Sequence, residues 1–595
     1  MQKFIDELSE HVKNAFEKAG YERELGRVSI SNRPDLCEYQ SNGAMAGAKK
    51  YKKAPMIIAN EVGELLKSDD IFKDVEVVAP GFINFNVKEG FLASYLNNML
   101  AEPKYGVWDP SEEEKQTIVI DYGGPNVAKP LHVGHLRPAI IGESIKRIAR
   151  YAGHDVYGDV HLGDWGLPMG QIITELSARK PELVYFDENY EGEYPDEPPF
   201  TISELEEIYP FASGKCKTDE EYKKKALLAT NQLQKGRRGY RALWKHILNV
   251  SVNDLKKNYE KLGVEFDLWK GESDVDPLIP EMVKKMKEDG FAYISDGALV
   301  VDIKKDTDKK ELPPCMILKS DGAANYETTD LATIIQRERD MKPDAIIYVV
   351  DKRQELHFEQ VFRCARKTGI VRDTTSLEFV GFGTMNGKDG HAFKTRDGGV
   401  LRLEYLLKTI TDKMFSDIEK NNSDKGKNLP EEETRDIALK AAIAALKYGD
   451  LSNQASKDYI FDIDRFTSFE GDTGPYILYT MARIKSILKK YIAQGGDLDN
   501  LRVAEAASES EKKLEMNMVM FNQMIDEAFR ERAPHKVCAF IYGLANQFNT
   551  FYHENNILGE QDEDRKKAYI ALISGCLKLF EASTKLLGFE APERM

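Results

Sequence analysis

The chain has 595 residues, 42% of them apolar and 31% charged, which is typical of a globular protein with several domains. Its net charge of −16 argues against binding nucleic acid over the whole surface, so a nucleic-acid partner would need a local basic face. Residues 222–246 offer either such a face or an ordinary solvated helix. The six cysteines form no CxxC pair, which argues against a disulfide framework and a cysteine zinc site and fits a reducing compartment.

The first domain is predicted to be an α+β unit at residues 1–108. It opens with an amphipathic helix in residues 1–20, which does not resemble a signal peptide. Helices are expected near both ends of residues 41–67, and residues 75–87 are strand-like. No apolar run in the chain approaches the ~20 residues of a membrane span. We therefore expect a cytoplasmic protein without a membrane partner.

A catalytic-type α/β domain is predicted at residues 115–400, after a polar linker. From Thr117 strands alternate with helices, which is typical of a Rossmann-like parallel sheet. A mostly helical insertion is expected at about 185–263, and after Gly399 the strand signals stop. Residues 401–595 are therefore predicted to form an all-α bundle. The candidate strands of the sheet are residues 117–122, 155–162, 297–303, 345–351 and 377–383.

Two histidines mark the turn after the first of these strands. His132 and His135 flank Gly134 where a helical pattern begins. Ligands of a parallel sheet bind at the carboxyl ends of its strands, and a helix start attracts phosphate. A zinc site would need further ligands, and a hydrolase would need a nucleophile motif that is absent here. We favour two imidazole donors to a nucleotide triphosphate, and simple capping of the helix stays open.

The residues around this turn resemble a known family. HVGH is similar to the HIGH signature of class I aminoacyl-tRNA synthetases, and "GPNVAKPLHVGHLRPAIIGE" with "GHDVYGDVHLGDWG" resembles the arginyl branch. Further similar stretches, in the family's order, include "GFINFNV", "FDLWKGES", "NYETTDLAT", "YVVDKRQELHFEQVF" and "LGFEAPERM". The resemblance extends from about residue 30 to Met595. Its rivals are another class I synthetase, a small-molecule nucleotidylyltransferase and a catalytically silent RNA-binding relative.

The resemblance implies ligation of L-arginine to tRNA(Arg) with ATP. An amino-acid carboxylate would attack the α-phosphorus of ATP, and the acyl group would then pass to the tRNA 3′ end. The attacking group is already ionised, so the first step needs positioning and charge neutralisation rather than a base. His132 and His135 would contact the phosphates, and Gly134 would make room for adenine. ATP with Mg²⁺ would be the substrate complex, no tightly bound metal is expected, and tRNA would bind before arginine is activated.

The second signature of the class, KMSKS, is altered in this chain. The matching stretch is "HAFKTRDGG", which supplies Lys394 and Arg396. In similar members of the family a lysine before the HIGH element is thought to compensate, and Lys129 occupies that place. We therefore assign phosphate charge first to Lys129 and then to Lys394 and Arg396.

A pocket for arginine should hold at least two acids, because carboxylates bind the planar guanidinium in a bidentate way. The family's pocket positions fall on Asn126, Glu272, Tyr326, Asp330 and Gln354, and His357 is expected to line the site. Tyr326 and Asp330 are four residues apart, which places both on one face of a helix. Asn126 and Gln354 would bind the α-amino and carboxylate end.

A helix in residues 474–490 shows two stripes. Ile477, Met481, Ile484 and Leu488 form an apolar stripe, and a second stripe lies roughly 140° around the helix. The second stripe suits either base stacking or another core contact, and the family's use of this helix for the anticodon loop favours stacking. The expected tRNA residues are Tyr476, Tyr479 and Arg483 of this stripe, Tyr552 and Met595 beside it, and Phe82 and Asn84 for a flipped D-loop base. We expect a monomer.

Overall fold

The computed structural model describes residues 1–129, 131–388, 390–391, 401–424 and 429–595. The chain forms two compact units. Unit 1 comprises Met1–Asp109, Phe469–Leu586 and Glu590–Met595, and unit 2 comprises Pro110–Ser468 and Leu587–Phe589. None of the described helices is long and apolar enough to cross a membrane.

The first part of unit 1 packs helices on an antiparallel sheet. The sheet order is β1-β2-β4-β3, with β1 at Ser29–Ile30, β2 at Tyr39–Ser41, β3 at Phe72–Val78 and β4 at Phe82–Val87. Alternate residues of β4 are buried, as expected for a strand with one face on a core. The helices are α1 (Phe4–Lys18), α2 (Gly43–Tyr51), α3 (Pro55–Leu66) and α4 (Glu89–Ala101).

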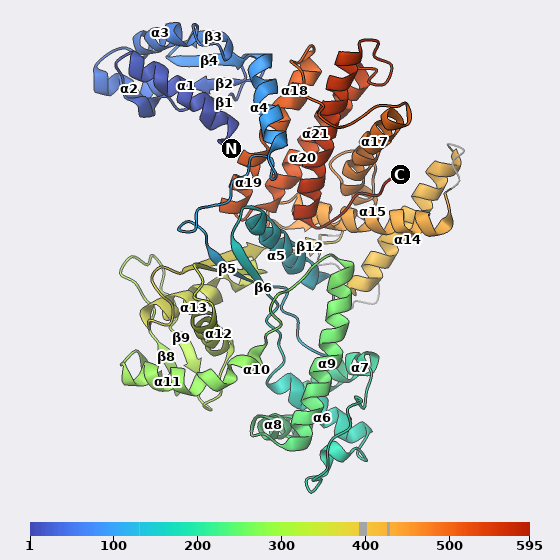
Figure 1. Ribbon diagram of the computed structural model, residues 1–595. Helices are drawn as coiled ribbons and strands as arrows, with labels where there is room; N and C mark the ends of the chain where they lie inside the picture. The colour runs from blue at the N-terminus through green and yellow to red at the C-terminus, as the bar shows by residue number, and fades with distance from the viewer. Residues whose placement is uncertain (130, 389, 392–400, 425–428) are drawn as a thin grey trace. The chain divides into compact units, whose positions relative to one another are not determined.

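The second part of unit 1 is helical and is drawn in orange and red in Figure 1. Its helices are α17 (Gly474–Ala493), α18 (Glu509–Met518), α19 (Phe521–Arg530), α20 (Pro534–Glu554) and α21 (Glu563–Leu587). Thr473 caps α17 by accepting from the amide of Tyr476, and Pro475 occupies the first turn, where its missing N–H is harmless. Ile477, Met481 and Ile484 are buried on α17, together with Leu488, so the predicted apolar stripe does face the core.

Unit 2 is built on a parallel sheet with the order β11-β10-β5-β6. The strands are β5 (Thr117–Tyr122), β6 (Asp155–Asp159), β10 (Ala345–Asp351) and β11 (Ser376–Phe382). Helix α5 (Val133–Tyr151) connects β5 to β6, and α13 (Glu355–Lys367) connects β10 to β11 after the 3₁₀ turn Lys352–Gln354. Helices between parallel strands of one sheet are the expected crossover connections, so the predicted α/β fold is confirmed.

One predicted strand belongs elsewhere. Residues 298–301, expected in the parallel sheet, form the middle of an antiparallel sheet of β7 (Ala292–Ser295), β8 (Ala298–Val301) and β9 (Cys315–Leu318). Asp296 and Gly297, which join β7 and β8, both have positive φ. A two-residue turn of that kind sends the chain back antiparallel, so the parallel assignment was wrong.

The remaining elements of unit 2 flank this frame. The insertion contains α6 (Leu167–Arg179), α7 (Ile202–Thr218), α8 (Glu220–Gln234) and α9 (Arg238–Lys261), drawn in cyan and green in Figure 1. It is followed by α10 (Glu272–Val275), α11 (Ile279–Glu288) and α12 (Tyr326–Asp340). Beyond residue 400 come α14 (Leu403–Asp424), α15 (Glu431–Leu451) and α16 (Ile463–Phe466). A short strand, β13 (Tyr459–Ile460), pairs with β12 (Met385–Asn386), so strands do not stop at residue 399 as the sequence suggested.

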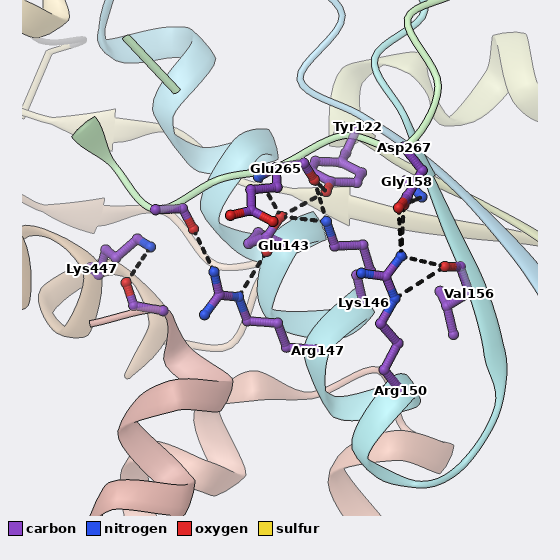
Figure 2. A network of polar contacts seen from close by, with 12 residues as sticks. Tyr122, Glu143, Lys146, Arg147, Arg150, Val156, Gly158, Glu265, Asp267 and Lys447 are labelled. Carbon is purple, nitrogen blue, oxygen red and sulfur yellow. Dashed lines mark hydrogen bonds and ion pairs between the residues drawn. The ribbon is translucent and has the colours of Figure 1, made fainter. Parts of the chain in front are cut away.

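A buried charge network fixes α5 against the segment that follows α9 (Figure 2). Glu143, 2% exposed, accepts hydrogen bonds from the Tyr122 hydroxyl and the Glu265 amide. It also forms ion pairs with Lys146 and Arg147, whose charges outweigh its burial and lower its pKa. Because a buried charge is stable only when paired in this way, α5 and residues 263–267 are held in one arrangement. This fixes the start of the segment that leads into α10.

Candidate active site at the carboxyl ends of the parallel strands

The two histidines cap α5 with their own rings. The Gly134 amide donates to Nδ1 of His132 over 3.0 Å, and the His132 amide donates to Nδ1 of His135 over 3.2 Å. The capping that the sequence left open is therefore present. Since each Nδ1 accepts a hydrogen bond, a neutral ring must carry its proton on Nε2. Capping at Nδ1 therefore leaves Nε2–H as the donor of each ring, so capping and a donor role are compatible.

Both rings are held neutral. They overlap with centroids 3.8 Å apart. Burial, and then the charge of Lys129, lowers the pKa of His132. Burial, His132 and Lys129 together lower the pKa of His135 to about 3. At pH 7 the pair therefore offers two neutral donors, while the positive charge beside them belongs to Lys129, whose ammonium lies 4.9 Å from the centroid of the Tyr209 ring.

A cavity of about 610 Å³ opens in front of these rings. It lies where β5 and β10 end, which is the usual ligand position in an open parallel sheet. Asp121 and Tyr122 of β5, and Asp351 of β10, are among its lining residues. The predicted site residues that line it are His132, Gly134, His135, Tyr326, Asp330, Gln354 and His357.

Acidic side chains gather on one side of this cavity. Asp330 projects from α12, and Glu272 is the first residue of α10. Burial, followed by the charges of Asp164 and Asp330, raises the pKa of Glu272 to about 7. A carboxyl whose ionised form is destabilised by burial and by neighbouring carboxylates is suited to bind a cation. The two acids predicted for a guanidinium are therefore close enough to interact, and one of them, Asp330, lines the same cavity as His132 and His135.

The other predicted arginine contacts lie around these acids. Asn126 forms a bridge with Gly163, next to the bridge between Leu162 and Gly271 that leads into α10. A Cβ on Gly163 would lie 2.0 Å from the Asn126 side-chain oxygen, so this approach requires glycine. Tyr326 is 74% exposed at the start of α12, and Gln354 ends the 3₁₀ turn before α13. Neither Asn126 nor Glu272 is itself among the cavity's lining residues.

Two acids of this region were not singled out from the sequence. Asp164 is 2% exposed and accepts hydrogen bonds from the amide and hydroxyl of Ser273. Glu327 lies 3.6 Å from His357, one turn before Asp330 on α12. Asp164 could have been found in the quoted stretch "GHDVYGDVHLGDWG", and Glu327 from its spacing of three residues to Asp330.

Lys394 and Arg396 lie outside the described residues. Lys129 lies close enough to His132 and His135 that its charge helps to lower the pKa of both rings. Within the described ranges, no group of three or more His, Cys, Asp or Glu side chains could hold a metal ion.

The second stripe of α17 forms an aromatic and cationic cluster. The guanidinium of Arg483 lies 5.0 Å from the ring centre of Tyr479 and 5.1 Å from that of Tyr552. Arg483 also donates to Asn549, and the Asn549 amide donates to the Tyr476 hydroxyl over 2.9 Å. The four predicted residues Tyr476, Tyr479, Arg483 and Tyr552 therefore form one cluster, in which α20 binds the polar atoms of Tyr476 and Arg483.

The remaining predicted tRNA residues lie elsewhere in unit 1. Glu593, two residues before Met595, pairs with Lys485 of α17 over 2.8 Å, which brings the end of the chain to that helix. Phe82 and Asn84 both point to the half-exposed face of β4, since Ile83 and Phe85 take the core face. Phe82 is therefore not a core residue, although a strand phenylalanine usually is.

Three family models match successive parts of the chain. Residues 6–87 match "Arginyl tRNA synthetase N terminal domain", residues 96–463 match "tRNA synthetases class I (R), catalytic domain", and residues 477–595 match "DALR anticodon binding domain". The second of these alone covers more than half of the chain.

Relatives of high identity extend over the full length. The chain is 61% identical to an arginine–tRNA ligase of Agathobacter rectalis and 54% identical to one of Alkaliphilus oremlandii, each over 100% of both chains. Among solved structures, the arginyl-tRNA synthetases of Plasmodium falciparum and Thermus thermophilus match 100% of both chains with TM-scores of 0.80 and 0.77, at 23% and 22% identity. These two structures support the fold.

Proposed function

Because the chain belongs to the arginyl-tRNA synthetase family and ligates L-arginine to tRNA(Arg) with ATP, we propose a specific division of roles among its residues. The single observation that carries this proposal is that Asp330 and both histidines of the HVGH turn line one cavity. A triphosphate and a guanidinium can then lie side by side, each facing groups of opposite polarity.

We assign activation to the turn at the start of α5. His132 and His135 donate through Nε2 to the phosphates of ATP, and Gly134 leaves space for the flat adenine. Lys129 supplies the fixed positive charge, and Lys394 and Arg396 join it. The arginine carboxylate needs no base, so these groups act by stabilising the negative charge that develops as pyrophosphate departs. Mg²⁺ arrives with ATP as part of the substrate.

Arginine is selected by Glu272 and Asp330. Their carboxylates receive the guanidinium, whose planar fork matches two acceptors, and Tyr326 covers its exposed side. Asn126 and Gln354 hold the α-amino and carboxylate end, and His357 lines the site. The support comes from Tyr326, Asp330, Gln354 and His357, which line one cavity, and from Glu272, whose pKa is raised to about 7 by burial and then by Asp164 and Asp330. A guanidinium would lower that pKa by favouring the ionised form.

The tRNA is bound by unit 1. Tyr476, Tyr479, Arg483 and Tyr552, with Met595 beside them, form a stacking surface for anticodon bases. Phe82 and Asn84 hold a flipped D-loop base. We accordingly propose an elbow-binding domain at 1–108, a catalytic domain at 115–400 with its insertion at 185–263, and an anticodon-binding domain at 401–595. We also propose that tRNA binds before arginine is activated.

Two further properties belong to the proposal. The protein acts as a monomer. It works in the cytoplasm, a location that its six free and buried cysteines suit.

Pyrophosphate exchange tests the assignment. The assay is run with arginine and ATP, with and without tRNA(Arg), and arginine should be exchanged only when tRNA is present. Exchange with a different amino acid would favour another class I synthetase, and exchange that ignores tRNA would remove the proposed order of binding. A complete lack of exchange, with tRNA still bound, would point to a catalytically silent RNA-binding protein.

A further inference from the structure

The arginine pocket contains a cation of its own. His357, on the first turn of α13, lies with Nε2 2.6 Å from Oδ2 of Asp330 and with Nδ1 3.6 Å from Oε1 of Glu327. Each of the three side chains is less than a quarter exposed. Only an imidazole protonated on both nitrogens can direct an N–H toward both carboxylates. The geometry suits an imidazolium that donates a hydrogen bond to Asp330 and forms a longer ion pair with Glu327.

The charges around this ring favour its protonated form. Burial by itself would lower the pKa of His357, but Asp330 and Glu327 outweigh it and raise the pKa to about 9. Two charged groups of neighbouring elements interact with these acids. Glu272 of α10 interacts with Asp330, and Lys319, which follows β9, interacts with Glu327.

We propose that His357 is a displaceable counter-cation, which neutralises Asp330 in the empty pocket and yields this carboxylate to the guanidinium of arginine. This inference rests on the proposed role of Asp330 in arginine binding. On displacement the ring keeps one nitrogen-bound proton and releases the other to solvent. Arginine binding is then the exchange of one cation for another and is accompanied by proton release.

The exchange follows from the geometry of the pocket. The imidazolium engages the Oδ2 atom of Asp330 directly, so a guanidinium bound to the same carboxylate would face a like charge at close range. Loss of the ring's proton removes that repulsion. A neutral analogue of the same shape, such as citrulline, supplies no charge to replace the imidazolium. His357 therefore helps the pocket to reject uncharged side chains and is a specificity-determining residue.

Calorimetry can count the released protons. Full-length protein is titrated with L-arginine at pH 7.5 in two buffers that differ in ionisation enthalpy. The wild type should release about one proton more than His357→Gln, since a group of pKa about 9 is charged at this pH and an imidazole returned to its ordinary pKa is not. Protons released by Glu272 are common to both proteins and cancel in the difference. Equal release from the two proteins would overturn the proposal.

The pH profile separates this role from a structural one. The arginine KM of the wild type should fall between pH 7 and pH 9. In His357→Gln only the part of the fall near pH 7, which comes from ionisation of Glu272, should remain. Glu327→Gln keeps the ring but removes one partner, so it should move the fall to lower pH. A KM raised by the same factor at every pH in His357→Gln would show that the ring only supports the fold, and would refute the proposal.

A matched control lies in unit 1, where His11 pairs with Asp69 over 2.8 Å. His11→Gln should release as many protons as the wild type, and a reduced count there would show that the difference does not come from the pocket and so count against the proposal. Asp330→Asn separates a failure of the His357 proposal from a failure of the proposed arginine pocket. If Asp330→Asn bound arginine as tightly as the wild type, the proposed arginine pocket itself would be wrong, whatever the result for His357.

Discussion

The cavity of unit 2 and the α17 surface of unit 1 are both proposed to bind ligands, but they are formed by different kinds of side chain. The cavity gathers ionisable groups with displaced pKa values, about 3 at His135, about 7 at Glu272 and about 9 at His357. The α17 surface gathers tyrosine rings around a single guanidinium, that of Arg483. The cavity therefore contains ionisable groups that differ in charge, and the α17 surface presents flat aromatic rings.

The difference reflects what each ligand demands. Transfer of a phosphoryl-linked group requires charges in position before the reaction, in a site sheltered from water. Splayed bases are held by stacking, which tolerates small shifts of the ligand. Changes in the cavity should therefore act on activation and on its pH dependence. Changes at α17 should act on tRNA affinity alone.

The largest effect is expected from the acids of the cavity. Asp330→Asn removes one of the two carboxylates proposed to bind the guanidinium in a shielded site. This change costs about 3–5 kcal/mol of binding free energy. The ratio kcat/KM for arginine in pyrophosphate exchange should fall roughly 150- to 5,000-fold. Asp340→Asn, at the exposed end of the same helix, is the matched control and should leave the ratio unchanged. An unaltered arginine KM in Asp330→Asn would contradict the pocket.

A slightly smaller effect should follow from His132→Asn. Asparagine is a good N-cap, so α5 keeps its first hydrogen bond, but the Nε2 donor toward phosphate is lost. The rate of activation should fall by about 3 kcal/mol, roughly 100-fold, with the thermal unfolding midpoint unchanged. His132→Ala should lose the same activity and also about 1 kcal/mol of stability. If asparagine retained full activity, the ring would serve only as a cap.

At α17 the expected loss is about 1–3 kcal/mol for each stacked base. Tyr479→Ala and Tyr552→Ala should each raise the KM for tRNA(Arg) in aminoacylation. At saturating tRNA the rate of pyrophosphate exchange should match that of the wild type, since the cavity is untouched. Ser486→Ala, an exposed change on the same helix, is the control. A loss of activation at saturating tRNA would break the separation of the two regions.

The smallest expected effect is on the stability of the fold. Here the substitution that removes activity should raise the free energy of unfolding. The pKa of Glu272 is about 7 in the folded protein, above the ordinary value, so the folded state binds this proton more tightly than the unfolded state. The resulting stabilisation is complete in acid and is lost as the pH rises toward 7. Glu272→Gln should therefore unfold at a higher temperature than the wild type at pH 8 and at the same temperature at pH 4.

After screening by cavity water, the gain from Glu272→Gln should be on the order of 1–2 kcal/mol. Scanning calorimetry at the two pH values measures it, and the same variant should lose arginine-dependent exchange. A gain of equal size at both pH values would mean that the carboxyl is not the cause.

Much of the architecture could be read from local patterns. The strands Thr117–Tyr122 and Ala345–Asp351 have the bounds expected from their apolar runs, and the α17 stripe follows helical periodicity. The family and its reaction are confirmed by relatives that match the whole chain. The failures were at turns. Residues 298–301 form a strand, as expected, but the conformation of Asp296 and Gly297 directs it into a different sheet.

The candidate site likewise combines features that the sequence could predict with features that it could not. Motif order assigned His132 to ATP, and Asp330 and His357 to the arginine site, and these roles stay predictions. The sequence could not tell that each histidine of the turn uses Nδ1 for capping, or that His357 faces both Glu327 and Asp330. The second of these facts depends on the distance between α12 and α13, which no spacing along the chain encodes.

The sequence by itself determined which segments are strands and helices and which polar residues stand at their ends, because periodicity and capping act over a few residues. Only the tertiary structure decided which of those polar residues share a charge environment. Burial and the approach of α10, α12 and α13 set the protonation of Glu272 and His357, and electrostatic interaction depends on separation in space.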